Sequence, residues 1–233
     1  MKKLIYSLFL LAAVGSFTSC HEVTTEDTSK VTYYATLELL GESTILWSLG
    51  EEYVDPGYVA ELNGEDVSST VVVTGSVDTS TPGIYTLLYQ VFNEDGFGVS
   101  DTRTVMVSDS SASPIESGFW TLQPGSYRNY SGTISNFSGF PITVLQLEPG
   151  IFYVSDLIGG YYDQGVGYGS DYAMVGYFQL NDDNSIDILS GDVSGWGDSM
   201  DSYENAYYDE ATGTINWDVA YAGVMVFHIS LGL

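Results

Sequence analysis

Two segments that combine glycine, aromatic residues and aspartate carry the side chains best suited to hold a ligand. One runs from Gly159 to Tyr172 and the other from Gly195 to Tyr203. Their Tyr and Trp rings offer flat apolar faces at low entropic cost, and the Asp residues among them accept hydrogen bonds from hydroxyl groups. Because sugar rings present CH-rich faces and hydroxyl edges, this mixture predicts a glycan-binding site. The predicted binding residues are Tyr161, Tyr162, Asp163, Tyr168, Asp171, Tyr172, Trp196, Asp198 and Tyr203.

The same rings have a second interpretation, in which they pack on their own domain and bond their hydroxyl groups to the backbone. For Tyr161 and Tyr162 individually we favour this packing role. Trp120 and Trp217 each fall within an expected strand and are predicted to be core residues. Trp196 is flanked by glycines in an expected loop and is the better candidate for an exposed ring.

This chain has few residues that could support nucleophilic or metal-dependent catalysis. It has 2 His and 1 Cys, which excludes multi-cysteine and histidine-rich metal sites. His21 stands beside the single Cys, whereas His228 falls on the last expected strand, on the face opposite Phe227 and Ile229, where a strand histidine without a catalytic role is expected. The sequence contains no phosphate-binding Gly-Lys motif or dinucleotide fingerprint, and Lys is absent after Lys30.

Paired carboxylates are the one catalytic device in good supply. A glycosidase needs two of them about 5 to 10 Å apart, one with a raised pKa. The acidic residues that stand near aromatic residues and could form such a pair are Asp156, Asp163, Asp171 and Glu204. With 31 Asp and Glu in the chain a chance pairing is expected, so we interpret these acids as parts of solvated loops and expect a protein without enzymatic activity.

Two acidic turns offer oxygen ligands of the kind that Ca²⁺ prefers. They are residues 93–95 and 181–184, and the second contains the calcium candidates Asp182 and Asp183. Neither turn matches the spacing of an EF-hand, and both are explained as hairpin turns. We therefore expect no cofactor, with calcium as the alternative.

The charge and the composition exclude several classes of protein. The chain has 5 Lys and Arg against 31 Asp and Glu, with a formal net charge of -26 and a pI of about 4.1. Such a surface repels phosphate backbones, so no nucleic-acid partner is expected. A hydrophobic content of 44% with 19 Tyr is too apolar for a disordered acidic tail and predicts a folded protein.

The N-terminal residues predict export and a membrane anchor. Lys2-Lys3 precedes an apolar run from Leu4 to Val14, which has the length of a signal h-region and is too short to span a bilayer. The sequence Phe17-Thr18-Ser19-Cys20 follows and resembles the lipobox of bacterial lipoproteins, with Phe in place of the more usual Leu. The resemblance implies that residues 1–19 are removed and that Cys20 is diacylated. A secretory signal with an incidental Cys is the alternative.

A lipid-anchored chain without a later membrane-spanning segment contacts the membrane through its anchor only. Residues 20–30 are polar and are expected to form the tether. Their acidic pair Glu26-Asp27 resembles the export signal of surface lipoproteins in Bacteroidetes. This resemblance favours the outer membrane and the cell surface, with a periplasm-facing location as the alternative.

After the tether the sequence predicts two all-β domains. Apolar residues alternate or form short β-branched and aromatic runs, punctuated by Gly, Asn, Asp, Ser and Pro. A small-residue linker (109–115) separates a spacer domain (31–108) from a C-terminal domain (116–233) that carries the ligand-binding loops. We expect an antiparallel sandwich for the first and an antiparallel meander for the second, as a rolled sheet or an up-and-down barrel. The strands expected in the meander are 119–122, 127–130, 142–147, 151–156, 173–180, 185–189, 205–208, 214–221 and 224–231.

Three motifs in the first domain occur in order, at residues 49–58 (LGEEYVDPGY), 77–85 (VDTSTPGIY) and 103–107 (RTVMV). Over about residues 38–108 the series closely resembles a bacterial immunoglobulin-like repeat, of a group close to the hyalin-repeat domains. Such repeats occur in many secreted and surface proteins, including carbohydrate-active ones. The resemblance implies an immunoglobulin-like sandwich that serves as a spacer.

The second domain carries motifs at residues 119–122 (FWTL), 125–128 (GSYR), 154–162 (VSDLIGGYY) and 193–198 (VSGWGD). With these it is similar to the C-terminal domain of a family of lipoproteins from gut Bacteroides, which pairs the same immunoglobulin-like repeat with a Gly/Tyr-rich β domain of unknown function. The resemblance implies an architecture and names no ligand.

These observations together predict a non-catalytic, lipid-anchored protein of the cell envelope that binds an extracellular glycan through the loops of its C-terminal domain. One alternative is a structural or protein-docking role, as an accessory subunit of an outer-membrane uptake complex. A second alternative is a glycoside hydrolase that uses paired carboxylates.

Overall fold

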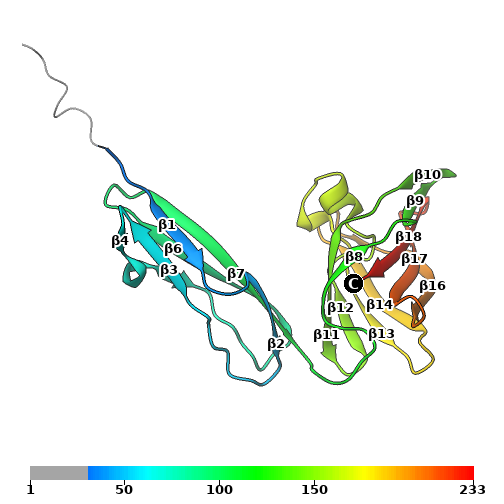
Figure 1. Ribbon diagram of the computed structural model, residues 1–233. Helices are drawn as coiled ribbons and strands as arrows, with labels where there is room; N and C mark the ends of the chain where they lie inside the picture. The colour runs from blue at the N-terminus through cyan, green and yellow to red at the C-terminus, as the bar shows by residue number, and fades with distance from the viewer. Residues whose placement is uncertain (1–30) are drawn as a thin grey trace, which may run out of the picture.

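The computed structural model describes residues 31–233 and contains two β-rich units that follow one another along the chain (Figure 1). The predicted signal peptide, the lipidation of Cys20 and the tether over 20–30 lie outside the described residues. Within the described part of the chain, no helix has the length and hydropathy needed to cross a membrane.

The N-terminal unit is a sandwich of two sheets, with strand orders β1-β3-β4 and β2-β7-β6-β5. Its elements are β1 (Ala35–Leu39), β2 (Thr44–Ser48), β3 (Tyr58–Leu62), β4 (Glu65–Asp66), the 3-10 helix η2 (Ser68–Thr70), β5 (Val72–Thr74), β6 (Gly83–Phe92) and β7 (Gly98–Ser108). The expected immunoglobulin-like sandwich is thereby confirmed. The expectation that all its strands pair antiparallel is wrong, because β1 and β2 belong to different sheets and β2 pairs with β7 in parallel.

An ion pair between a buried arginine and a half-buried aspartate holds the loop between β2 and β3 against β7. Arg103 on β7 is fully buried, and its Nη1 lies 2.5 Å from Oδ1 of Asp55. Nη2 donates to the carbonyl oxygens of Leu40 (2.6 Å) and Gly57 (3.3 Å), and Tyr89 on β6 donates its hydroxyl proton to Asp55. The network therefore joins β6 and β7 of one sheet to the loop and to Leu40 and Gly57, which flank β1 and β3 of the other sheet.

The C-terminal unit is a single sheet of 11 strands. Its strands are β8 (Gly118–Leu122), β9 (Tyr127–Tyr130), β10 (Thr133–Asn136), β11 (Pro141–Glu148), β12 (Ile151–Val154), β13 (Val175–Leu180), β14 (Ile186–Val193), β15 (Asp198–Ser199), β16 (Ser202–Asp209), β17 (Thr214–Tyr221) and β18 (Met225–Gly232). In this sheet β11 to β15 and β16 to β18 pair in chain order as a meander, whereas β8 pairs with β11 and β18 lies between β8 and β9. The expected meander is confirmed, although β10 and β15 correspond to no expected strand, because each is short and lacks an apolar alternation.

This sheet rolls up until β14 approaches β16. The two edges meet through one isolated antiparallel bridge, Ser185 with Tyr207, and through the hydrogen bond from the amide of Tyr208 to the carbonyl of Asn184 (2.9 Å). Alternate residues of β17 and β18 fill the interior, in agreement with the clean alternation of the sequence. Trp120 and Trp217 are both buried there, as predicted.

The two ends of the barrel carry different segments of the chain. In an antiparallel meander every second connection lies at the same end, so the segment after β12, the turn after β14 and the turn after β17 share one end (Figure 1). The linker from the N-terminal unit attaches at the other end, where the amide of Asp109 donates to the carbonyl of Gln146 near the end of β11 (3.0 Å). The predicted binding loops therefore lie at the end of the barrel that faces away from the linker.

Candidate functional site

The long connection between β12 and β13 is folded around a buried carboxylate. Asp156 is 1% exposed, and its Oδ1 accepts hydrogen bonds from the amides of Ile158 (2.9 Å) and Met174 (3.1 Å). Its Oδ2 accepts from the amide of Gly160 (3.0 Å). Burial raises the pKa of Asp156 to about 7, although the hydrogen bonds from the three amides act in the opposite direction and lower it. The side chain ties the first turn of the connection to its last residue and so fixes both ends.

Two consecutive glycines bring this connection onto the barrel interior. Gly159 and Gly160 have φ of 67° and 77°, a region in which L side chains are strained. A Cβ on Gly159 would also lie 2.8 Å from side-chain carbons of Leu122 and Ile229. The chain then forms the π-helix η3 (Tyr161–Gly165) and the 3-10 helix η4 (Ser170–Tyr172).

Trp196, in the turn after β14, lies at the centre of a group of rings. Its ring centroid is 4.8 Å from that of Tyr162, 4.9 Å from Tyr172, 6.3 Å from Tyr168 and 6.3 Å from Tyr221 of β17. We call these rings, together with Tyr161, the aromatic cluster. The connection after β12, the turn after β14 and the strand β17 all contribute rings to it. Edge-to-face pairs of this kind each add about 0.5 to 1.5 kcal/mol of stability beyond the effect of the area that they bury.

The aromatic cluster has a partly buried base and an exposed rim. Tyr161 and Tyr162 pack against Phe227 at 5.5 and 6.1 Å between ring centroids, in agreement with the packing role favoured for them. Tyr168 is 55% exposed and Trp196 is 42% exposed, so these two rings present their surface to solvent. The prediction of an exposed Trp196 is confirmed.

The predicted acidic residues are arranged around the cluster in different ways. Asp171 joins the two loops through its backbone, because its carbonyl accepts from the amide of Gly195 (2.6 Å) and from Ser194 Oγ (3.1 Å). Asp198 accepts a hydrogen bond from the hydroxyl of Tyr221 (2.7 Å), and burial together with this contact raises the pKa of Tyr221. Asp163 lies in η3, where its charge adds to the raised pKa of Asp156.

Tyr203 belongs to another part of the barrel. It lies on β16, packs against the core and donates its hydroxyl proton to Asp187 of β14 (3.3 Å). Glu204 follows it as an exposed residue of the same strand. The sheet therefore places these two predicted residues with the seam between β14 and β16 rather than with the rings around Trp196.

The remaining candidate residues have local partners. Asp183 accepts from the amide (3.0 Å) and the hydroxyl (2.5 Å) of Ser185, which lower its pKa, and Asp182 is an exposed residue of the same turn. Between residues 31 and 233 no group of three or more His, Cys, Asp and Glu side chains is placed to hold a metal ion. His228 faces outward from β18, with Nδ1 2.6 Å from Oδ1 of Asp218 and its ring stacked on Tyr127 at 5.0 Å.

Sequence reasoning missed Tyr221, Phe227 and Arg128 as neighbours of the loops. Arg128 on β9 places its Cζ 4.6 Å from the centroid of Tyr161. The alternation of the sequence indicated the strands on which these residues lie. Which loops the strands face depends on how the sheet closes.

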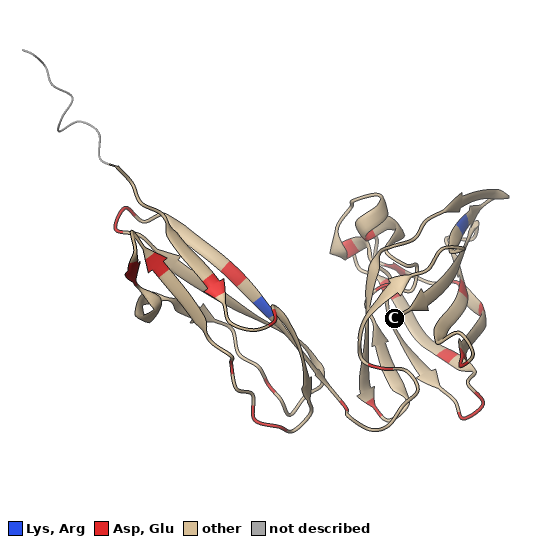
Figure 2. Ribbon diagram, viewed as in Figure 1, with Lys and Arg blue, Asp and Glu red and all other residues tan. Residues whose placement is uncertain are grey.

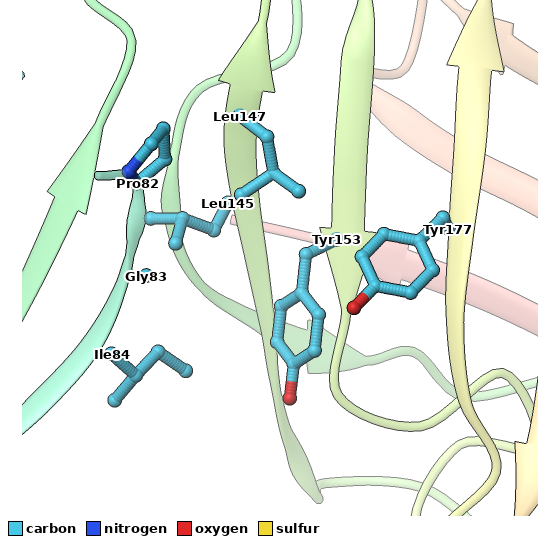
Figure 3. A pocket seen from close by; sticks show the side chains of 7 residues that line it. All are labelled: Pro82, Gly83, Ile84, Leu145, Leu147, Tyr153 and Tyr177. Atoms are coloured by element: carbon cyan, nitrogen blue, oxygen red, sulfur yellow. The ribbon is translucent and has the colours of Figure 1, made fainter.

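A hollow lies between the two units and is lined mainly by carbon (Figure 3). It has a volume of about 240 Å³ and is lined by Pro82, Gly83, Ile84, Leu145, Leu147, Tyr153 and Tyr177. The rings of Tyr153 and Tyr177 meet edge to face at 5.9 Å between centroids. Two phenolic hydroxyls are the only polar side-chain groups in this lining, which suits contact between the units better than recognition of a sugar with many hydroxyls.

Comparison with known proteins identifies both units. The bacterial surface protein Ig-like domain matches residues 37–107, and a family described as a C-terminal domain matches residues 109–232. The crystal structure of the lipoprotein BT2262 from Bacteroides thetaiotaomicron is 52% identical, with a TM-score of 0.76 over 86% of this chain and 100% of that chain.

A more distant solved structure contains CBM51-2 in complex with GlcNAc and INT domains from Clostridium perfringens ZmpB. It is 18% identical over 52% of this chain and 31% of that chain, and its TM-score of 0.28 is too low to support an inference about fold or ligand. No curated protein matches the chain. The matches to both units and to the Bacteroides structure show that the chain belongs to a family of Bacteroides lipoproteins in which a surface immunoglobulin-like domain precedes an all-β C-terminal domain.

Proposed function

We propose that the protein is anchored by lipid in the outer membrane, faces the cell exterior and binds a glycan at the aromatic cluster without covalent chemistry. The observation that carries the proposal is the convergence of Tyr168, Tyr172 and Trp196 at the barrel end that faces away from the linker, with Tyr168 and Trp196 open to solvent. The N-terminal unit then acts as a spacer between the anchor and this end.

The cluster is suited to a sugar because its rings are held before a ligand arrives. Trp196 is held by edge-to-face contacts with Tyr162 and Tyr172, and the loop that carries the two tyrosines is fixed at both ends by Asp156. A ring that is already ordered loses little conformational entropy on binding. CH-rich sugar faces would stack on Trp196 and Tyr168, while carboxylates such as Asp171 accept hydrogen bonds from the hydroxyl edges.

Replacing Trp196 by alanine is expected to weaken glycan binding by about tenfold or more, because the variant removes the central exposed ring. The measurement is isothermal titration of the Cys20→Ser chain against a panel of plant and host polysaccharides. Phe119→Ala is the matched control, since Phe119 is a 51% exposed ring on β8 of the same barrel and lies outside the cluster. A folded wild-type chain that binds nothing on the panel would contradict the proposal.

Replacing Cys20 by serine is expected to move the protein from the membrane fraction to the soluble fraction, because no acyl chain can then be attached. Metabolic labelling with a fatty acid, followed by fractionation, measures the anchor. Protease treatment of intact cells measures the exposure: degradation of the wild-type chain supports the cell surface, and full protection argues for the periplasm-facing location.

A docking role is the second candidate function, and it is favoured by apolar side chains at the tether end of the N-terminal unit. Tyr33, Tyr34 and Phe97 are each about half exposed (51%, 61% and 49%), and the rings of Tyr34 and Phe97 lie 5.6 Å apart. A photo-crosslinking residue at position 34 is expected to yield one discrete adduct in whole cells if this surface docks on an outer-membrane complex. The same probe at exposed Glu61 is the control, and adducts at neither position would count against docking.

Hydrolysis has less support from the geometry. Asp156 is buried and satisfies three amides, so it is closed to a glycosidic bond, and Glu204 lies on another face of the barrel. A glycosidase would have to use Asp163, Asp171 or Asp198 around the cluster. Release of reducing ends from a bound polysaccharide, lost in Asp163→Asn, would overturn the non-catalytic proposal.

A further inference from the structure

Arg128 enters the mouth of the barrel because of the register of β9 on β18. Arg128 pairs with Phe227 and Tyr130 pairs with Met225, whereas Tyr127 pairs with His228. Cross-strand partners share a face of the sheet, so Arg128 and Tyr130 lie on the inner face with Phe227. Tyr127 stacks on His228 on the outer face.

The guanidinium group touches the base of the aromatic cluster. Its Cζ lies 4.6 Å from the ring centroid of Tyr161 and 5.5 Å from that of Tyr130. Burial raises the pKa of Tyr162, and a hydrogen bond from Arg128 and its charge oppose that effect. The ring centroids of Tyr162 and Trp196 lie 4.8 Å apart. The ring of Tyr162 therefore separates the positive charge of Arg128 from Trp196, the central exposed ring of the proposed glycan site.

This charge is unusual for the protein. In a chain with 31 Asp and Glu, residues 31–233 contain only the basic residues Arg103 and Arg128 (Figure 2). Arg103 is fully buried and paired with Asp55. Arg128 forms no ion pair with an Asp or Glu of this range, and its Nε is buried without a hydrogen-bond partner.

A guanidinium that served only to fill space between Tyr130 and Tyr161 would need no charge, since a methionine of similar length packs without the cost of dehydrating a cation. A planar fork of N–H donors in a partly dehydrated aromatic site matches the oxygens of a carboxylate or sulfate group, and such charge-assisted bonds are stronger than neutral ones. The surrounding acids would repel an anion placed elsewhere on the surface.

We propose that the glycan is acidic and that a carboxylate or sulfate group on the sugar binds Arg128, while a neighbouring part of the sugar stacks on Trp196 and Tyr168. The inference rests on the proposed glycan-binding function and adds the class of ligand. It also assigns to Arg128 a specificity role that the rings alone do not supply.

The test uses matched ligands that differ in charge alone. Galacturonan oligomers and their methyl esters form the carboxylate arm, and carrageenan oligomers and their desulfated, neutral form make up the sulfate arm. We expect the Cys20→Ser chain to bind the charged member of one pair about tenfold more tightly or better. The arm in which the difference occurs identifies the group, and raising the salt concentration should reduce the difference because the contact is partly open to solvent.

Arg128→Met is expected to abolish the preference for the charged member, so that the two members of a pair bind with equal affinity. Arg128→Lys keeps the charge without the fork and should give an intermediate ratio. Asn129→Met, at the neighbouring position on the opposite face of β9, is the matched control and should keep the wild-type ratio.

The possible failures are distinguishable. Equal affinity for charged and neutral members in the wild-type chain, or an unchanged ratio in Arg128→Met, overturns the acidic ligand and leaves glycan binding intact. Loss of binding to every member in the wild-type chain overturns the proposed function as well. If Arg128→Met does not fold, the ratio of Arg128→Lys and the salt dependence of the wild-type ratio decide the matter.

Discussion

Replacing Asp156 by alanine is expected to lower the free energy of unfolding of the C-terminal barrel by about 3 to 5 kcal/mol and to abolish binding at the aromatic cluster. The variant leaves the amides of Ile158, Gly160 and Met174 buried without an acceptor, and each such group costs about 1 to 3 kcal/mol. Urea unfolding followed by the fluorescence of Trp120 and Trp217 measures the change. Wild-type stability in the variant would contradict the role assigned to this carboxylate.

Asp156→Asn separates the charge from the shape. The amide keeps an oxygen for Ile158 and Met174 and loses the bond to Gly160, so a smaller loss of stability is expected than for alanine. Exposed Asp192→Asn, on the adjoining β14, is the control for a general effect of removing one negative charge.

The wild-type chain and Asp156→Asn also test how the stability of the barrel depends on pH. Burial raises the pKa of Asp156 to about 7 in the folded protein, above its value of about 4 in an unfolded chain. The folded state therefore favours the protonated group, and the contribution of Asp156 to stability is largest below about pH 4 and declines as the pH rises toward about 7. Relative to Asp156→Asn, the wild-type barrel should lose stability between about pH 4 and about pH 7; parallel profiles would show that the pKa is not raised.

Replacing Asp55 by alanine is expected to destabilise the N-terminal unit by about 3 to 5 kcal/mol, because Arg103 would remain as a buried charge without its counter-ion. Domains of this size have total stabilities of about 5 to 15 kcal/mol, so the unit should unfold at a much lower temperature while the barrel is unaffected. Calorimetry of the full chain, with its two units resolved, measures the effect. Glu61→Ala, which removes an exposed carboxylate from β3, is the control.

The double variant Asp55→Leu with Arg103→Met should recover part of the loss, because it removes both charges from the interior.

The contribution of Asp55 to stability depends on pH with the opposite sign from that of Asp156. Partial burial raises the pKa of Asp55, but the hydrogen bonds from Tyr89 and Gly57 and the charge of Arg103 outweigh it, so the pKa lies below its ordinary value. The stabilisation is therefore present above the unfolded-state pKa of about 4 and is lost as the pH falls below it. Equal stability of Asp55→Ala and wild type at neutral pH would show that solvent compensates Arg103.

The strands that were predictable are those whose evidence is local. In β17 the residues Ile215, Trp217 and Val219 alternate with neighbours that are mostly polar, and the Ala-Gly turn follows, so both the strand and its buried face could be predicted directly. β15 has two residues and exists only because β14 offers an edge to pair with. The parallel pairing of β2 with β7 likewise depends on which sheet β2 joins, and alternation is the same for either direction.

In the candidate site too, the features that were predictable are the local ones. Glycine on both sides of Trp196 and of the tyrosines indicated loops with large rings, and the structure shows Trp196 and Tyr168 at the surface. Nothing in the spacing indicated that Tyr203 would pack near Asp187 instead, or that Tyr221 would lie against Trp196. Asp156 was recognised as an acid near aromatic residues, but its burial under three amides depends on the fold of an 18-residue span that closes on Met174.

The sequence by itself determined that this is an acidic all-β chain with two units, strands of known inner face and ring-bearing turns, because alternation, turn propensity and charge are properties of neighbouring residues. Only the tertiary structure decided which turns meet, that Arg128 enters the mouth of the barrel and that Asp156 is closed to solvent. These outcomes follow from strand register and from closure of the sheet at Ser185 and Tyr207, where residues distant in the chain are paired and no local pattern records the partner.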